Sequence, residues 1–418
     1  MTSLGKLIVG MTLIVIVLAG CQTTSGSSSG ISIGPQLSSF INKVKRIGKE
    51  PISNSDPDRP RLDIVIPVFD PGLPEEGKEY DEEGLWPELR RAEAIRFAQK
   101  LKTALEATEA FGAVRITPDK TATGDLYILA KIEESDGEDV QIAIEVFDIS
   151  GTLWLADSFD HEVQASFHKN VRNEGKDPYD PVFEEAAKSI VEELGYHETA
   201  ELKDIQRLTD LRFGASFVED AFSEHMALDD GNYKLVSFPS TDDPMLARTK
   251  AVRVRDQLFV DGLQDNYRSF SEKMDTSYAI WQEQSLLELK AKREANAKAV
   301  GEAVGGVLLI GLAVAAVVAG ADSNSVNASM IAGTAGVVAG VAGAKLLSNS
   351  FQTSEEAKVH RDALEELGES IDSDLAPRVV AFEKQTVELT GSAKEQFAQW
   401  RAFLKRIHVL EKTPEKLL

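Results

Sequence analysis

The alternation of hydrophobic and polar residues between positions 61 and 197 predicts a small sheet covered by two helices. Runs that are β-branched or alternate in polarity predict strands at 62–69, 113–116, 125–133, 140–147 and 152–159. Apolar residues at helical spacing predict one helix over 87–111, ended by Gly112, and a second over 181–194. The resulting order, β-α-β-β-β-β-α, predicts a two-layer α+β domain with a mainly antiparallel sheet and one covered face.

Two features fix the expected details of this sheet. Asp136-Gly137 and Ser150-Gly151 separate the last three predicted strands, and both dipeptides are typical of hairpin turns. The apolar face of the strand at 140–147 consists of Val140, Ile142, Ile144 and Val146.

After residue 197 the period changes to that of helices with an apolar seam. Residues 198–300 and 349–418 are expected to form a coiled-coil-like helical body, with 252–300 as a single long helix and a break at Pro377. The first seam comprises Leu208, Leu211, Ala215, Val218 and Phe222. The second comprises Leu263, Tyr267, Phe270, Met274, Ser277 and Trp281. Two further seams are expected from Leu364, Leu367, Ile371 and Leu375, and from Phe397, Trp400, Leu404 and Ile407.

A glycine-rich segment, 301–348, interrupts the helical body. Residues 303–321 and 323–344 carry no charge and flank a polar turn at Asp322. As a helix, 303–321 would be about 28 Å long, close to the thickness of a bilayer's hydrocarbon core. Small residues form rows that let helices approach closely, as in a glycine zipper; they are Gly301, Gly305, Gly311, Ala315, Ala319, Ala332, Gly336, Gly340 and Ala344. The pattern predicts a membrane hairpin. A hairpin buried inside the protein or an oligomer, or one that inserts later, stays open.

The first residues resemble the signal peptide of bacterial lipoproteins. A basic start and an apolar run over 7–18 precede Leu18-Ala19-Gly20-Cys21, which resembles the lipobox and contains the chain's only cysteine. The resemblance implies cleavage after residue 20, and a diacylglycerol and a further acyl chain on Cys21. The Gly/Ser-rich residues that follow predict a flexible tether over 21–60. The alternative is an uncleaved anchor helix with a buried cysteine.

Two observations indicate which membrane is expected. Gln22, rather than Asp, follows Cys21, which by the same resemblance implies the outer membrane facing the periplasm. Basic residues flank the glycine-rich segment, while its turn carries only Asp322. A hairpin spanning the inner membrane from the periplasm would then violate the positive-inside rule. The inner membrane is therefore the less favoured location.

The predicted α+β domain resembles the small domains of periplasmic assembly and transport lipoproteins. The curli secretion lipoprotein group, the N-terminal domain of TolB and auxiliary lipoproteins of ABC transporters are of this kind. The resemblance lies in the strand, the helix ending in LKTALEATEAFGAVRI (101–116) and the meander beginning GDLYILAKI (124–132). It implies a docking or oligomerisation module without catalysis. An unrelated α+β domain is the alternative.

Composition and motifs exclude several classes of function. The 418 residues carry a formal net charge of -23, which disfavours binding to nucleic acid. A single cysteine excludes an intrachain disulfide and a cysteine-based zinc site. The six histidines form no metalloprotease motif, and phosphate loops and nucleophile elbows are missing, so we expect no enzyme, cofactor or metal.

Together these patterns divide the chain into a signal peptide (1–20), an acylated tether (21–60), a periplasmic α+β domain (61–197), a helical body (198–300), a membrane hairpin (301–348) and a C-terminal helical region (349–418). We expect a structural or docking component of an envelope transport, secretion or assembly complex. Its expected partners are membrane lipid, further copies of the chain and envelope proteins. A helical pore former and an activator of a cell-wall enzyme are the alternatives.

Overall fold

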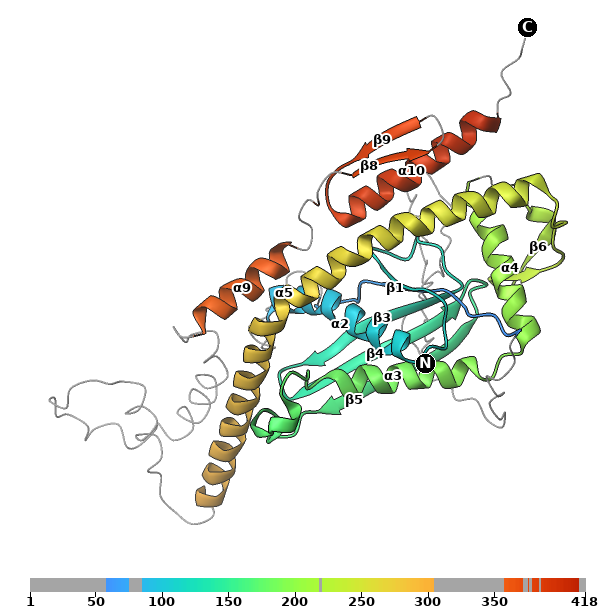
Figure 1. Ribbon diagram of the computed structural model, residues 1–418. Helices are drawn as coiled ribbons and strands as arrows, with labels where there is room; N and C mark the ends of the chain where they lie inside the picture. Colours follow the sequence, from blue (N-terminus) through green and yellow to red (C-terminus); the bar gives the residue numbers. More distant parts are fainter. Residues whose placement is uncertain are drawn as a thin grey trace, which may run out of the picture. The chain divides into compact units, whose positions relative to one another are not determined.

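The computed structural model describes residues 58–74, 85–217, 220–303, 357–370, 375, 378–382 and 385–412, which form a mixed α+β fold (Figure 1). Its main element is a five-stranded sheet in the order β2-β1-β3-β4-β5. The strands are β1 (Ile64–Pro67), β2 (Val114–Thr117), β3 (Leu126–Ser135), β4 (Asp139–Asp148) and β5 (Leu153–Glu162). The predicted order of strands and helices in this part of the chain is confirmed.

The sheet is mixed, whereas the sequence predicts a mainly antiparallel one. β1 lies between β2 and β3 and runs parallel to both. The reason is the connection from β1 to β2, which crosses over through a helix and so returns the chain in the same direction. β3, β4 and β5 form the predicted antiparallel meander. Its turns place Gly137 and Gly151 at φ values of 99° and 97°, a region that favours glycine.

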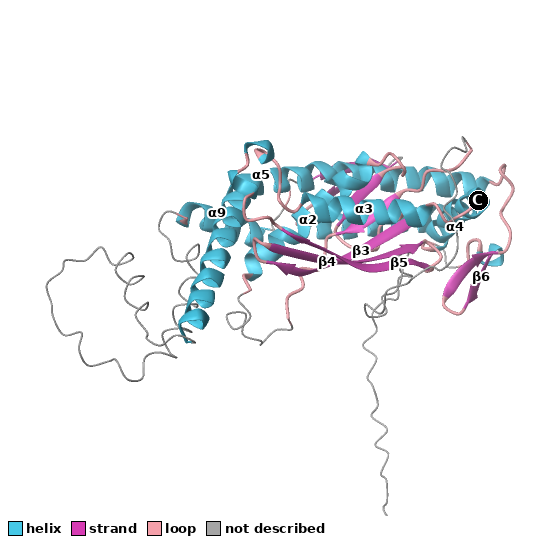
Figure 2. Cartoon of the chain, turned by 90° about the horizontal axis from the view of Figure 1, so that it is seen from below, coloured by secondary structure: helices cyan, strands magenta, loops and turns pink. Residues whose placement is uncertain are grey.

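Two helices cover one face of the sheet, α2 (Pro87–Ala107) and α3 (Asp180–Leu194) (Figure 2). The predicted apolar face of β4, which contains Val140, Ile142, Ile144 and Val146, lies in the hydrophobic core, as expected. α2 ends at Ala107 rather than at the expected Gly112, because Glu109 adopts a left-handed φ of 54°. Gly112 instead lets the chain approach β1, since a Cβ there would lie 2.5 Å from Asp63 Oδ1.

The chain between β5 and the long helix contains 3-10 turns at Phe167–Lys169, Val171–Asn173 and Ser223–His225, helix α4 (Thr199–Ala215) and a hairpin of β6 (Met226–Asp229) and β7 (Asn232–Leu235). The predicted seam from Leu208 to Phe222 is wrong at its end. α4 stops at Ala215, and Phe222 turns the chain with a left-handed φ of 62°. The Phe222 ring then packs on Gly214, where a Cβ would lie 2.6 Å from it.

Helix α5 (Pro244–Ala303) is 60 residues long and includes the whole of the helix predicted at 252–300. Its predicted seam is largely correct, since Leu263, Tyr267, Met274 and Trp281 are buried. α5 also covers the edge strand β2. The Gln264 side chain accepts from the Ile116 N–H at 2.9 Å and donates to the Ile116 carbonyl at 2.8 Å, so this edge residue has hydrogen-bond partners.

The described C-terminal elements are α9 (Lys358–Glu369), strands β8 (Arg378–Phe382) and β9 (Gln385–Leu389), and α10 (Ala393–Lys412). α9 packs against α2, and Gly368 permits the close approach, because a Cβ would lie 2.1 Å from the Glu88 carbonyl oxygen. Leu375 lies outside any helix, so the expected seam does not extend to it. The predicted face of α10 is buried and consists of Phe397, Trp400, Leu404 and Ile407.

Candidate functional site

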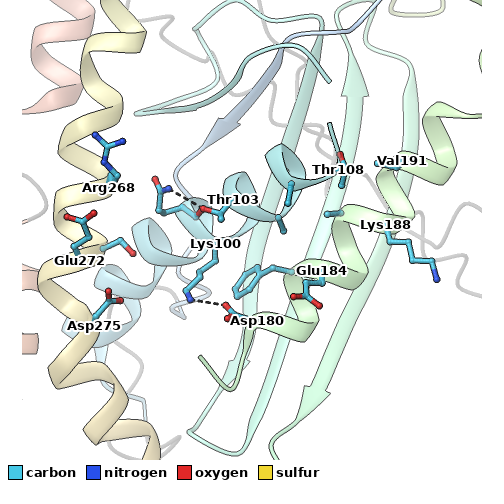
Figure 3. Close-up of a pocket in the computed structure, with 16 residues that line it drawn as sticks. Lys100, Thr103, Thr108, Asp180, Glu184, Lys188, Val191, Arg268, Glu272 and Asp275 are labelled. Carbon is cyan, nitrogen blue, oxygen red and sulfur yellow. Dashed lines mark hydrogen bonds and ion pairs between the residues drawn. The ribbon is translucent and has the colours of Figure 1, made fainter. Parts of the chain in front are cut away.

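A groove of about 750 Å³ lies on the outer side of the helical layer, between α2, α3 and α5 (Figure 3). α2 and its C-cap contribute Lys100, Thr103, Ala104, Ala107 and Thr108, and α3 contributes Asp180, Phe183, Glu184, Ala187, Lys188 and Val191. α5 contributes Arg268, Ser271, Glu272 and Asp275. The floor is therefore apolar, with Ala104, Ala107 and Val191 at its surface, while charged side chains lie along the sides.

Three residues that line the groove, Lys100, Asp180 and Asp275, belong to a cluster of charges that joins all three helices. Arg96 of α2 donates to Asp177 at 2.7 Å and pairs with Asp275 of α5. Its guanidinium lies 4.7 Å from the centre of the Tyr278 ring. Lys100 lies 3.1 Å from Asp177 and 2.8 Å from Asp180 of α3. We call these residues the Arg96 cluster.

Electrostatics in the Arg96 cluster favour the charged forms. Burial by itself raises the pKa of Asp177, but Arg96 and Lys100 outweigh it and hold this pKa at about 2. Burial likewise lowers the pKa of Arg96, and the carboxylates of Asp177 and Asp275 overcome that effect and raise it. The Arg96 cluster is thus an ion-pair network with both signs of charge present in the folded protein.

Beneath the Arg96 cluster lies a fully buried carboxyl group, Glu93 of α2. Its Oε1 accepts from the Ser135 hydroxyl of β3 at 2.6 Å and from the Tyr278 hydroxyl of α5 at 2.7 Å. Burial raises the pKa of Glu93, against the opposing effect of Arg90. Glu93 does not line the groove. Its geometry suits a group that holds α5 against the sheet.

A second charged cluster holds the first part of α5 near the start of β3. Arg253 of α5 donates to Asp210 of α4 at 2.7 Å and lies 3.5 Å from Asp125. Asp125 also accepts from the Thr209 hydroxyl at 2.6 Å. Burial raises the pKa of Asp125, and Arg253 opposes this. We call these residues the Arg253 cluster.

Further along α5, Asp256 is a buried anchor for the last helix. It accepts from the Trp400 indole N–H at 3.0 Å and from Arg401 at 3.1 Å. α5 is therefore bound by buried polar contacts to α2, α4 and α10.

One group of carboxylates in the described part of the chain is close enough to hold a metal ion. The ligand oxygens of Glu134, Asp136 and Asp139, at the turn between β3 and β4, all lie within 4.8 Å of one another. Asp136 Oδ1 already accepts the N–H groups of Glu138 and Asp139. Arg293 of α5 donates to Glu138 at 2.7 Å. We therefore interpret this group as an acidic turn with an arginine counterion.

The residues singled out by the sequence lie almost entirely elsewhere. Gly301 is in the last turn of α5. The remaining residues lie outside the described part of the chain and stay predictions; they are Cys21, Gly305, Gly311, Ala315, Ala319, Ala332, Gly336, Gly340 and Ala344. No helix formed by the described residues has both the length and the apolar character needed to cross a membrane.

Sequence reasoning missed the Arg96 cluster. Its members are scattered over almost 180 positions, from Arg96 to Asp275. The one local signal is the run Asp177-Pro178-Tyr179-Asp180-Pro181, whose two acids precede and begin α3. That run looks like an ordinary helix start, and only the fold brings Arg96 and Lys100 against it.

Comparisons with protein-family models, with curated proteins and with solved structures give no match to this chain. Its function is therefore inferred from its own residues.

Proposed function

We propose that the protein is a membrane-anchored lipoprotein, acylated at Cys21, that acts as a structural or docking component of a cell-envelope transport, secretion or assembly complex. The observation that supports this most directly is the attachment of α5. The Arg253 and Arg96 clusters fix this helix to α4, α2 and the sheet at two separate positions along its length. A long helix held in this way suits a positional role.

The buried acids support a holding role in particular. Glu93 and Asp125 have raised pKa values, which in an enzyme would suggest proton transfer. Neither lines the groove, and each is hydrogen-bonded to a hydroxyl of a neighbouring element. Breaking such contacts is costly, because a buried polar group loses its hydrogen-bond partner. We infer that these groups stabilise the arrangement of helices.

In this proposal the helical body holds both ends of the glycine-rich segment in position relative to the α+β layer. α5 ends at Ala303, inside the segment 301–348 that the sequence predicts to be a membrane hairpin. α9 begins at Lys358 and packs on both α5 and α2. The proposed hairpin would therefore be connected at both ends to helices that are fixed on the α+β layer. Packing of its small residues with those of other copies would make the protein a homo-oligomer.

Site-specific photocrosslinking in living cells tests the docking role. A photoreactive residue replaces Ala107, an exposed position of the groove, or Glu185, an exposed position of α3 outside it. We expect a crosslinked product from position 107 that contains an envelope protein by mass spectrometry, and much less from position 185. No product at position 107, in cells where the protein is folded and abundant, would contradict the proposed role.

A further inference from the structure

We propose that the groove between α2, α3 and α5 binds a basic amphipathic helix of a partner protein. This inference rests on the proposed docking function and specifies the chemistry of the partner. It follows from three properties of the groove, which are its backbone, its floor and its unpaired charges.

The backbone of the groove favours a helical occupant. All three walls are helices, whose interior N–H and C=O groups are already bonded within each helix. An extended peptide gains main-chain hydrogen bonds from a sheet edge, and this groove offers none. The occupant must therefore satisfy its own backbone, as a helix does. Along α3 the lining runs from Asp180 to Val191, about 17 Å or three helical turns.

The floor favours an apolar stripe on that helix. Ala107 is exposed and Ala104 and Val191 are half-buried, so the floor presents methyl groups at its surface. Small side chains let a second helix approach closely and bury an apolar row of its own. A polar helix would lose water from this floor without gaining contacts.

The charges favour a basic partner. Most charged side chains in the groove are already paired: Lys100 with Asp177 and Asp180, Asp275 with Arg96, and Arg268 with Asp265. Among the described residues that line the groove, Glu184, Glu272 and Lys188 form no ion pair and are exposed. Lys188 lies at the rim and its ammonium group points away from the other labelled residues (Figure 3). The available charge is therefore negative on two walls, which complements lysine or arginine.

Peptide binding to the full-length protein tests the proposal. The probe is a fluorescent amphipathic peptide of about sixteen residues, with leucine and alanine on one face and lysine on both flanks. A second peptide carries glutamate in place of every lysine. We expect the basic peptide to bind at least about tenfold more tightly than the acidic one, and more weakly as salt is added.

Matched variants locate the site. Glu184→Lys in the groove should weaken binding of the basic peptide by about tenfold, and Glu184→Lys with Glu272→Lys further. Glu185→Lys makes the same charge change one residue along α3, outside the groove, and should leave binding within about twofold. Glu184 and Glu185 are both exposed, so neither change should disturb folding.

Several results would overturn the proposal. They are equal binding of the two peptides, equal effects of Glu184→Lys and Glu185→Lys, or a crosslink from position 107 that joins two copies of this chain. Membrane attachment is measured separately, in cells that produce the same wild-type protein and variants. Loss of peptide binding with attachment intact contradicts this inference alone, whereas peptide binding by a protein that is not attached contradicts the proposed function alone.

Discussion

Arg96→Met should loosen the attachment of α5 by leaving Asp177 as a buried carboxylate without its main partner. The Arg96 and Asp177 side chains are only 5% and 6% exposed, and they lie 2.7 Å apart. Removing one member of such a buried pair costs about 3–5 kcal/mol. Lys100 stays 3.1 Å from Asp177, so we expect the lower end, about 3 kcal/mol of unfolding free energy.

Urea unfolding followed by circular dichroism measures this loss, and hydrogen exchange over residues 271–282 reports whether α5 is loosened locally. Arg207→Met is the control, because Arg207 forms an exposed ion pair with Asp204, and both residues lie on α4. Such pairs contribute at most about 1 kcal/mol. If Arg96→Met and Arg207→Met unfold at the same urea concentration, the Arg96 cluster does not hold α5.

The dependence on pH gives a second test of the same cluster. The pKa of Asp177 is held at about 2, below its ordinary value of 3.8. A depressed pKa stabilises the folded state above pH 4, and this contribution, about 2 kcal/mol, is lost as the pH falls from 4 toward 2. Arg96→Met should reduce that loss. An unchanged acid profile would contradict the assigned pairing.

Three further changes test other contacts. Gly368→Ala should lower the melting temperature, at a cost of about 1–3 kcal/mol, because its Cβ would lie 2.1 Å from the Glu88 carbonyl oxygen; an unchanged melting temperature would show that α9 and α2 are not in close contact. Asp256→Asn removes the counterion of Arg401 and should speed hydrogen exchange in α10 but not in α2. If α10 exchanges at the same rate in the variant and in the wild type, Asp256 does not anchor this helix. Glu93→Gln should become relatively more stable than the wild type as the pH rises above 4.5, since the raised pKa of Glu93 makes its ionisation unfavourable in the folded state; parallel pH profiles of unfolding would contradict this.

The sheet was predictable because its signals are local. Asp136-Gly137 and Ser150-Gly151 predict the turns of the meander, and both glycines adopt the expected positive φ. The parallel pairing of β1 was missed, since it depends on which strands become neighbours after α2 has crossed the sheet. The hairpin of β6 and β7 carries its own local signal, Asp230-Gly231, which sequence reasoning missed.

The groove and its charges were not predictable, because they depend on contacts between distant segments. Periodicity places Tyr278 only near a helical seam, and nothing local indicates that its hydroxyl donates to Glu93, 185 positions earlier. Asp177 looks like a loop residue until Arg96 and Lys100 are brought against it. Long-range ion pairs of this kind follow from the fold, and no characteristic spacing of residues in the sequence indicates them.

Fractionation of the cell envelope tests whether Cys21 and the glycine-rich segment anchor the protein in the membrane. We compare the wild type with Cys21→Ser, and with Cys21→Ser in which residues 304–345 are replaced by a short glycine-serine linker. We expect the wild type to stay with the outer membrane after an alkaline wash, and Cys21→Ser to stay membrane-bound through its glycine-rich segment. The combined variant should be released although it is folded. Recovery of the wild type in the soluble fraction without detergent would contradict the proposed membrane anchoring.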